Sequence, residues 1–95
     1  GEGNGPSFYL GGRGSKLLES PNVDVKERGD IVVDIWVDRL GNVVKAQIKS
    51  KGTEVFDPNQ RKMAIEAALN SKFEEDPTAE VQQRGTITYT FILLK

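Results

Sequence analysis

Apolar and polar residues alternate over two neighbouring stretches near the middle of the chain, residues 30–38 and 43–50. A short loop that contains Gly41 separates them. Alternation with a period of two is typical of half-buried antiparallel strands, so we predict a β-hairpin. The apolar positions on its inner face are Ile31, Val33, Ile35, Val37, Val44, Ala46 and Ile48.

The outer face of the predicted hairpin carries opposite charges, with Asp34 and Asp38 on the first strand and Lys45 and Lys49 on the second. Opposite charges on neighbouring strands stabilise their register. We therefore interpret the carboxylates as members of cross-strand ion pairs, and not as a catalytic acid and base. Trp36 lies on the same face. It is either an exposed aromatic anchor for a partner or a side chain covered by the N-terminal segment or a lysine stem.

A helix start signal follows the hairpin. Asp57 suits the N-cap, Pro58 the first helical position and Gln60 the third position of a capping box. We predict a helix over residues 58–73. The stripe that would face the sheet consists of Ala64, Ile65, Ala68, Leu69 and Phe73.

The last stretch, residues 86–94, alternates again and is rich in β-branched and aromatic residues, which favours a third strand. The order strand, strand, helix, strand predicts an α+β fold. We expect a two-layer sandwich of a three-stranded antiparallel sheet and one main helix. The inner face of the last strand would consist of Ile87, Tyr89, Phe91 and Leu93.

The glycine-rich residues 1–14 are predicted to be a flexible lead-in, with a short strand or turn at residues 7–10. Residues 15–95 then form one domain. Residues 16–29 contain Pro21 and no sustained period, so we expect an irregular segment there. Residues 11–14, Gly-Gly-Arg-Gly, are interpreted as a flexible turn and not as a phosphate-binding loop.

The composition argues against several classes of function. The 95 residues suffice for one domain and include no cysteine and no histidine, which removes the commonest nucleophile–base pairs and many metal sites. The formal net charge of −1 provides no basic field for nucleic acid. We expect no enzyme, no cofactor and no metal. The acidic run at residues 74–76 is interpreted as a solvated helix end rather than a cation site.

The chain begins with glycine, and its one methionine is Met63. We therefore expect it to be cut from a longer protein. No apolar run reaches the roughly 18 residues that a membrane span needs.

The predicted last strand is the most informative surface. It has no proline or charge before Lys95, whereas natural edge strands usually carry such residues. As an edge it would be a template for strand addition by a partner. The alternatives are a central strand, or an edge already covered by residues 8–10, which would then act as an internal competitor. The residues of the candidate partner-binding edge are Thr86, Ile87, Thr88, Tyr89, Thr90, Phe91, Ile92 and Leu93.

Four features together resemble the C-terminal domain of the TonB family of periplasmic energy transducers. They are the hairpin of residues 29–52, the small-residue helix of residues 64–73 that ends in Lys-Phe, the acidic Pro-containing residues 75–77, and a closing Gly-x-Ile-x-Tyr-x-Phe pattern over residues 85–91. A Tyr-Pro motif found in many members is replaced here by residues 19–22, Glu-Ser-Pro-Asn.

The resemblance implies a periplasmic domain of an inner-membrane-anchored protein. Such a domain binds the TonB box of outer-membrane receptors by strand addition along residues 86–94. It transmits force from the proton-driven ExbB–ExbD motor to drive the uptake of siderophores, vitamins or glycans. Trp36 and Arg13 are candidates for additional partner contacts. The alternatives are an interaction module of a membrane-bound sensor or peptidase-like protein, and a self-associating domain that forms a homodimer.

Overall fold

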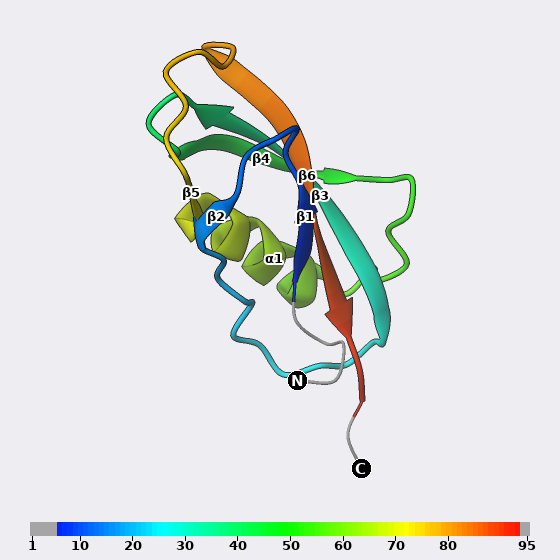
Figure 1. Cartoon of the computed structure of the whole chain (residues 1–95). Coiled ribbons are helices and arrows are strands. Elements are labelled where there is room, and N and C mark those ends of the chain that lie inside the picture. Colours follow the sequence, from blue (N-terminus) through cyan, green and yellow to red (C-terminus); the bar gives the residue numbers. More distant parts are fainter. Residues whose placement is uncertain (1–5, 94–95) are drawn as a thin grey trace.

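The structure is a computed structural model that describes residues 6–93. It has an α+β fold in which one helix packs on a four-stranded antiparallel sheet of order β1-β6-β3-β4, beside a small sheet of β2 and β5 (Figure 1). The predicted two-layer class is confirmed, and the short strand expected near residues 7–10 adds a fourth strand. The elements are β1 Ser7–Tyr9, β2 Ser15–Leu17, β3 Gly29–Asp38, β4 Val43–Lys49, α1 Pro58–Asn70, β5 Lys72–Phe73 and β6 Gln82–Phe91.

The centre of the sheet is the pairing of β3 with β6. Each strand has 10 residues, and the ladder runs without a break from Gly29↔Phe91 to Asp38↔Gln82. This pairing sets bounds for the last strand that differ from the predicted 86–94. The strand begins at Gln82 because Asp38 is available opposite it, and it ends at Phe91 because β3 begins at Gly29. Leu93 is outside the strand and 50% exposed, and residue 94 lies outside the described residues.

The predicted inner face of the hairpin is correct for β3 and partly wrong for β4. The register shifts between Trp36↔Lys45 and Val37↔Val43, which leaves Val44 as the extra residue of a β-bulge. The bulge reverses the alternation, so that Val43 is buried and Val44 is 46% exposed.

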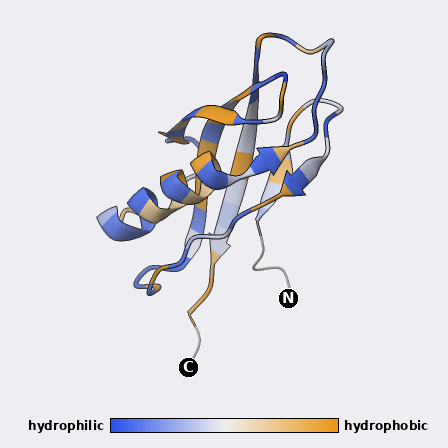
Figure 2. Ribbon diagram, turned by 90° about the vertical axis from the view of Figure 1, so that its left-hand side faces the viewer, coloured by the Kyte–Doolittle hydropathy of each residue, from blue (hydrophilic) through white to orange (hydrophobic). Residues whose placement is uncertain are grey.

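Helix α1 ends at Asn70, before the predicted residue 73. Ser71 has extended backbone angles, and its hydroxyl donates to the Ala67 carbonyl oxygen, which closes the last turn. Phe73 instead belongs to β5 and donates its N–H to the Gly41 carbonyl oxygen. Leu69, predicted to face the sheet, is 41% exposed. The buried face is Gln60, Ala64, Ala67 and Ala68, and the hydrophilic colour of the first turns in Figure 2 reflects how little of α1 is apolar.

Gln60 does not close the predicted capping box. Asp57 is the N-cap as expected, and its carboxylate accepts from the Gln60 backbone N–H at 2.9 Å. The Gln60 side chain is fully buried and turns to another segment. Its Oε1 accepts from the backbone N–H groups of Lys26 and Glu27, and its Nε2 donates to the Glu27 carbonyl oxygen, all at 2.9 Å. Gln60 therefore attaches the irregular segment before β3 to the helix.

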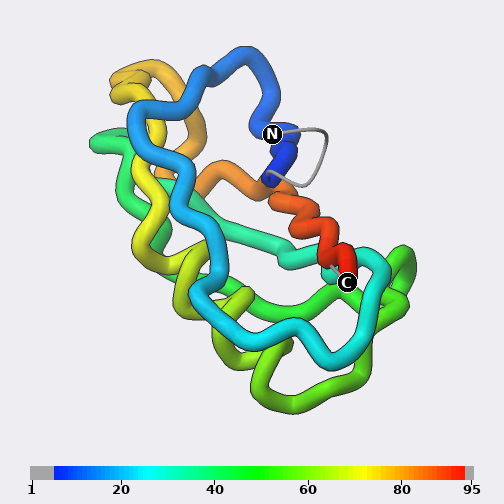
Figure 3. The backbone as a smooth tube through the Cα atoms, turned by 90° about the horizontal axis from the view of Figure 1, so that it is seen from below, coloured from blue at the N-terminus to red at the C-terminus, as the bar shows by residue number. Residues whose placement is uncertain are grey.

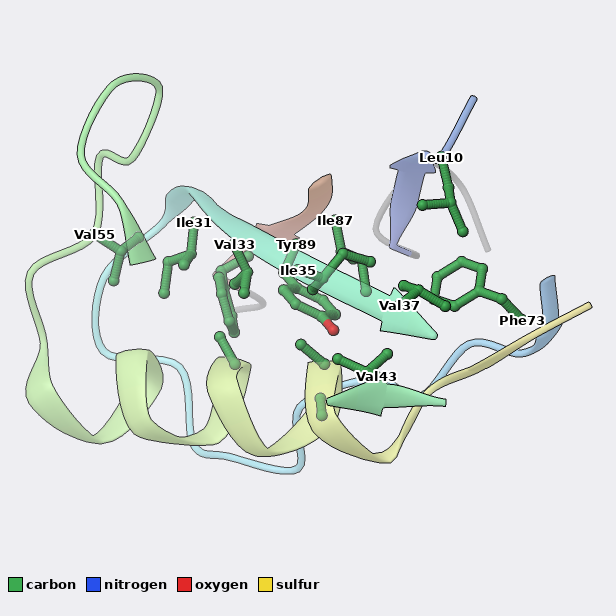
Figure 4. Close-up of a cluster of buried hydrophobic side chains, with 14 residues drawn as sticks. Leu10, Ile31, Val33, Ile35, Val37, Val43, Val55, Phe73, Ile87 and Tyr89 are labelled. Carbon is green, nitrogen blue, oxygen red and sulfur yellow. The ribbon is translucent and has the colours of Figure 1, made fainter. Parts of the chain in front are cut away.

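The segment between β2 and β3 runs beside α1, as the blue-to-cyan tube of Figure 3 shows. The even-numbered residues from 20 to 28 are exposed, whereas Val23 and Val25 are half-buried and pack against the core. The core itself lies between the sheet and α1, with Tyr89 pointing into its middle (Figure 4).

Gly41 is the turn position that requires glycine. Its φ is +93°, and a Cβ added there would lie 1.9 Å from the Phe73 carbonyl oxygen. We predict that Gly41→Ala lowers the free energy of unfolding by about 3 kcal/mol or more, because it adds a backbone collision to the penalty for positive φ.

Gly12→Ala is the matched control for this prediction. Gly12 also has a positive φ, +78°, but a Cβ there meets nothing within 4 Å. Only the conformational penalty of about 1–2 kcal/mol remains. Urea unfolding of both variants measures the difference, and equal losses of stability would contradict the close approach of Gly41 to Phe73.

Candidate functional site: the outer edge of strand β6

Strand β1 covers only the middle of the outer edge of β6. β1 pairs antiparallel with residues 86–88, in the register Ser7↔Thr88, Phe8↔Ile87 and Tyr9↔Thr86. The sequence left open whether this strand is a free edge, a central strand or an edge covered by the N-terminal segment. In the structure the N-terminal segment covers it over residues 86–88.

β1 is held mainly at its C-terminal end. Leu10 is 2% exposed and belongs to the core. Next to it, a Cβ on Gly85 would lie 2.4 Å from the Tyr9 carbonyl oxygen, so the two backbones approach closely there. Further back, the Phe8 ring packs edge-on against Phe73 with ring centroids 5.3 Å apart. Tyr9 points outward and is 71% exposed.

Beyond β1, residues 89–91 of β6 have no strand on their outer side within residues 6–93. β1 begins only at Ser7, directly after Pro6, which has no N–H to donate. A groove of about 220 Å³ opens beside this free stretch. Among the described residues no charged side chain lines it; the lining residues are Pro6, Ser20, Pro21, Val23, Val25, Tyr89, Thr90, Phe91 and Ile92.

Tyr89 connects this edge to the core. Its residue is 2% exposed, and burial raises the pKa of its hydroxyl, which keeps the group neutral. Among the described residues the hydroxyl makes no hydrogen bond, and the nearby Ser71 hydroxyl donates to the Ala67 carbonyl oxygen and accepts from the Glu19 N–H. Tyr89 supplies packing to the site in its neutral form.

The outer face of the sheet does not have the ion pairs predicted from the sequence. Asp34 is buried and pairs with Arg84 of β6 at 3.0 Å, whereas the residue opposite it on β4 is Gln47. Asp38 accepts from the backbone N–H groups of Leu40 and Asn42 and so forms the turn of the hairpin. Asp34 is thus in a cross-strand ion pair as expected, but its partner and the role of Asp38 were predicted wrongly, because alternation places a residue on a face and does not give its diagonal and cross-strand neighbours.

Trp36 lies between two cations on that face. The Lys45 Nζ is 4.6 Å and the Arg84 guanidinium carbon 5.1 Å from the ring centroid. Trp36 is therefore half-buried between a lysine and an arginine side chain. This arrangement agrees with the interpretation that a lysine stem covers the ring. Its role as a partner contact stays a prediction.

Arg13, the other predicted partner contact, is only 6% exposed. Its guanidinium donates to the Asp38 and Glu74 carbonyl oxygens at 2.8 and 3.1 Å and to Gln83 Oε1 at 3.1 Å. These bonds join the turn after β1 to β6 and to two loops. In this conformation Arg13 offers little surface to a partner and holds segments of its own chain together.

The acidic run and the glycine-rich turn also have structural roles. Asp76 accepts from the backbone N–H and the hydroxyl of Thr78, and these bonds lower the pKa of its carboxyl. Within residues 6–93 no group of three or more aspartate or glutamate side chains is arranged to hold a metal ion. Residues 10–13 form a turn closed by the Arg13 N–H and the Leu10 carbonyl oxygen.

The sequence interpretation missed one wall of the groove. Pro21, Val23 and Val25 belong to residues 16–29, which we expected to be irregular. Residues 18–28 form no helix or strand, whereas residues 16–17 belong to β2 and Gly29 begins β3. The signal in the sequence was that these three apolar residues occupy every second position. In an extended segment that packs one side against a core, apolar and polar residues alternate whether or not the segment joins a sheet.

Comparisons of the chain with protein-family models, with curated proteins and with solved structures find no match. Among the described residues, no helix has the length and apolar character required to cross a membrane.

We predict that Arg13→Met lowers the free energy of unfolding by about 2 kcal/mol or more, because it leaves buried carbonyl groups without their charged donor. Arg28→Met is the control, since Arg28 is exposed and its replacement should change stability by less than about 0.5 kcal/mol. Chemical denaturation measures both. An Arg13→Met protein as stable as the control would show that Arg13 is not a structural residue.

Proposed function

We propose that this domain binds an extended segment of a partner protein by β-strand addition to the outer edge of β6. The observation that carries the proposal is the stretch at residues 89–91, which has no strand on its outer side within residues 6–93 and opens onto an uncharged, largely apolar groove. Main-chain hydrogen bonds along such an edge provide affinity with little demand on the partner's sequence, and a neighbouring pocket adds selectivity.

The resemblance of the sequence to TonB-like C-terminal domains makes the proposal more specific. The partner would be the TonB box of an outer-membrane receptor, and the domain would be the periplasmic part of an inner-membrane-anchored transducer coupled to ExbB and ExbD through other regions. The central ladder of β3 and β6 supports a role in transmitting force. A partner added to β6 would join a strand that pairs with β3 over 10 residues, so tension would be shared by many hydrogen bonds.

A titration with a TonB-box peptide, followed by NMR, tests this proposal. We expect the amide signals of residues 86–93 to shift while those of β4 stay in place, because only the β6 edge gains a neighbour. Unchanged spectra at millimolar peptide would overturn the proposal. Repeating the titration at two protein concentrations separates peptide binding from self-association through the same edge.

We also predict that Ile92→Lys weakens peptide binding about tenfold, or about 1.4 kcal/mol, because it places a charge in the uncharged groove. Val81→Lys is the matched control. Val81 is another exposed apolar residue, 68% against 41% for Ile92, and it adjoins the opposite end of the same strand. Equal effects of the two variants on the peptide dissociation constant would contradict a role for the groove.

A further inference from the structure

We infer that β1 is a displaceable occupant of the binding edge, and that the partner segment enters at residues 89–91 and then replaces β1 along residues 86–88. This inference rests on the proposed function and deepens it, since it specifies both the regulation of the edge and the chemistry of the segment that the edge accepts. Four observations carry it.

The first observation is that the covered and free parts belong to one continuous edge. β1 pairs with residues 88 to 86 in sequence order, and β6 continues without interruption to Phe91. A segment that enters opposite residues 91–89 in the antiparallel direction therefore reaches the positions of β1 as it extends. It cannot pair with residues 86–88 while β1 is present, so the two compete for the same backbone groups.

The second observation is that β1 is short and unevenly held. It has 3 residues, of which Ser7 and Tyr9 are exposed. The strong attachments follow it, at the buried Leu10 and at Arg13. Ser7 and Phe8 can therefore leave the sheet while Leu10 stays in the core, which makes the opening local rather than global.

The third observation is that a strand paired with this edge of β6 has surroundings that favour apolar side chains at all of its inward-facing positions. Phe8 faces the core side opposite Ile87 and contacts Phe73. Positions opposite Tyr89 and Phe91 have the same orientation, because strand side chains alternate. They face the groove with Val23 and Val25 on its other wall.

The fourth observation concerns residues 1–5, the part of this chain that directly precedes Pro6 at the groove. The residues before Pro6 are Gly, Glu, Gly, Asn and Gly, which carry no apolar side chain. They offer nothing suited to an apolar lining. The segment that fits the whole edge is thus a six-residue extended peptide from a partner, with apolar side chains at alternate positions and uncharged residues between them.

The affinity for such a peptide depends on how often β1 is open. When only a fraction of molecules is competent to bind, the apparent dissociation constant rises by the inverse of that fraction. Loosening β1 should therefore tighten binding, and locking β1 should weaken it. The chain has no cysteine, so an engineered pair at Ser7 and Thr88, which are opposite each other, forms a single defined disulfide.

The experiment uses the full chain and an acetylated peptide with valine, isoleucine and phenylalanine at alternate positions and threonine between them. A permuted peptide with the three apolar residues adjacent is the control ligand. We expect Phe8→Ala to bind the alternating peptide about tenfold more tightly than the wild type. Tyr9→Thr, which changes an outward-facing β1 residue, should stay within about twofold. Oxidised Ser7→Cys/Thr88→Cys should bind at least about tenfold more weakly and recover on reduction.

Two results would overturn the inference: equal affinities of the oxidised and reduced cross-linked protein, or a permuted peptide that binds as well as the alternating one. The cross-link comparison remains decisive if Phe8→Ala fails to fold. Hydrogen exchange of the wild type without peptide separates this inference from the proposed function. The amides that pair β1 with β6 should exchange at least about 100-fold faster than those that pair β3 with β6, and equal rates would overturn displacement even if peptides bind.

Discussion

The unbroken ladder between β3 and β6 is the constraint on which the rest of the structure depends. It joins residues distant in the sequence over 10 positions in each strand, and it orients both inner faces toward one core. Once this pair is fixed, β4 can add only on one side and β1 only on the other. The helix then covers the shared apolar face through small alanine side chains, which allow a close approach to the sheet.

Irregular segments are attached to this framework by buried polar side chains. Gln60 binds the backbone of residues 26–27, and Arg13 binds the backbone of Asp38 and Glu74. In both cases a side chain supplies the hydrogen bonds that loop backbone groups lack when they leave regular structure. The bonds of Gln60 help to order the long connection between β2 and β3, which forms a wall of the groove.

The outer edges of β4 and β6 differ in a way that matters for the proposed function. β4 carries lysines and a bulge, both of which discourage pairing with another chain. β6 has no lysine and no bulge in its ladder with β3; β1 covers three of its residues, and within residues 6–93 no strand lies on the outer side of residues 89–91. In the proposed function a partner therefore pairs with the edge of β6 and not with that of β4. Because β1 covers only three residues of this edge, access of the partner to it can be regulated.

The sequence by itself determined the local structure. Alternation placed the inner faces of β3 and β6, and Asp57 and Pro58 marked the start of α1, because these signals act between residues a few positions apart. The tertiary structure decided what depends on distant neighbours. The bulge at Val44, the pairing of Asp34 with Arg84, the burial of Arg13 and the bonds of Gln60 all follow from which segments meet, and a period of two or 3.6 carries no information about that. The extent of the open edge also depends on which distant segments meet. The sequence identified the strand, but only its register with β3 and β1 fixed which residues are covered and which remain beside the groove.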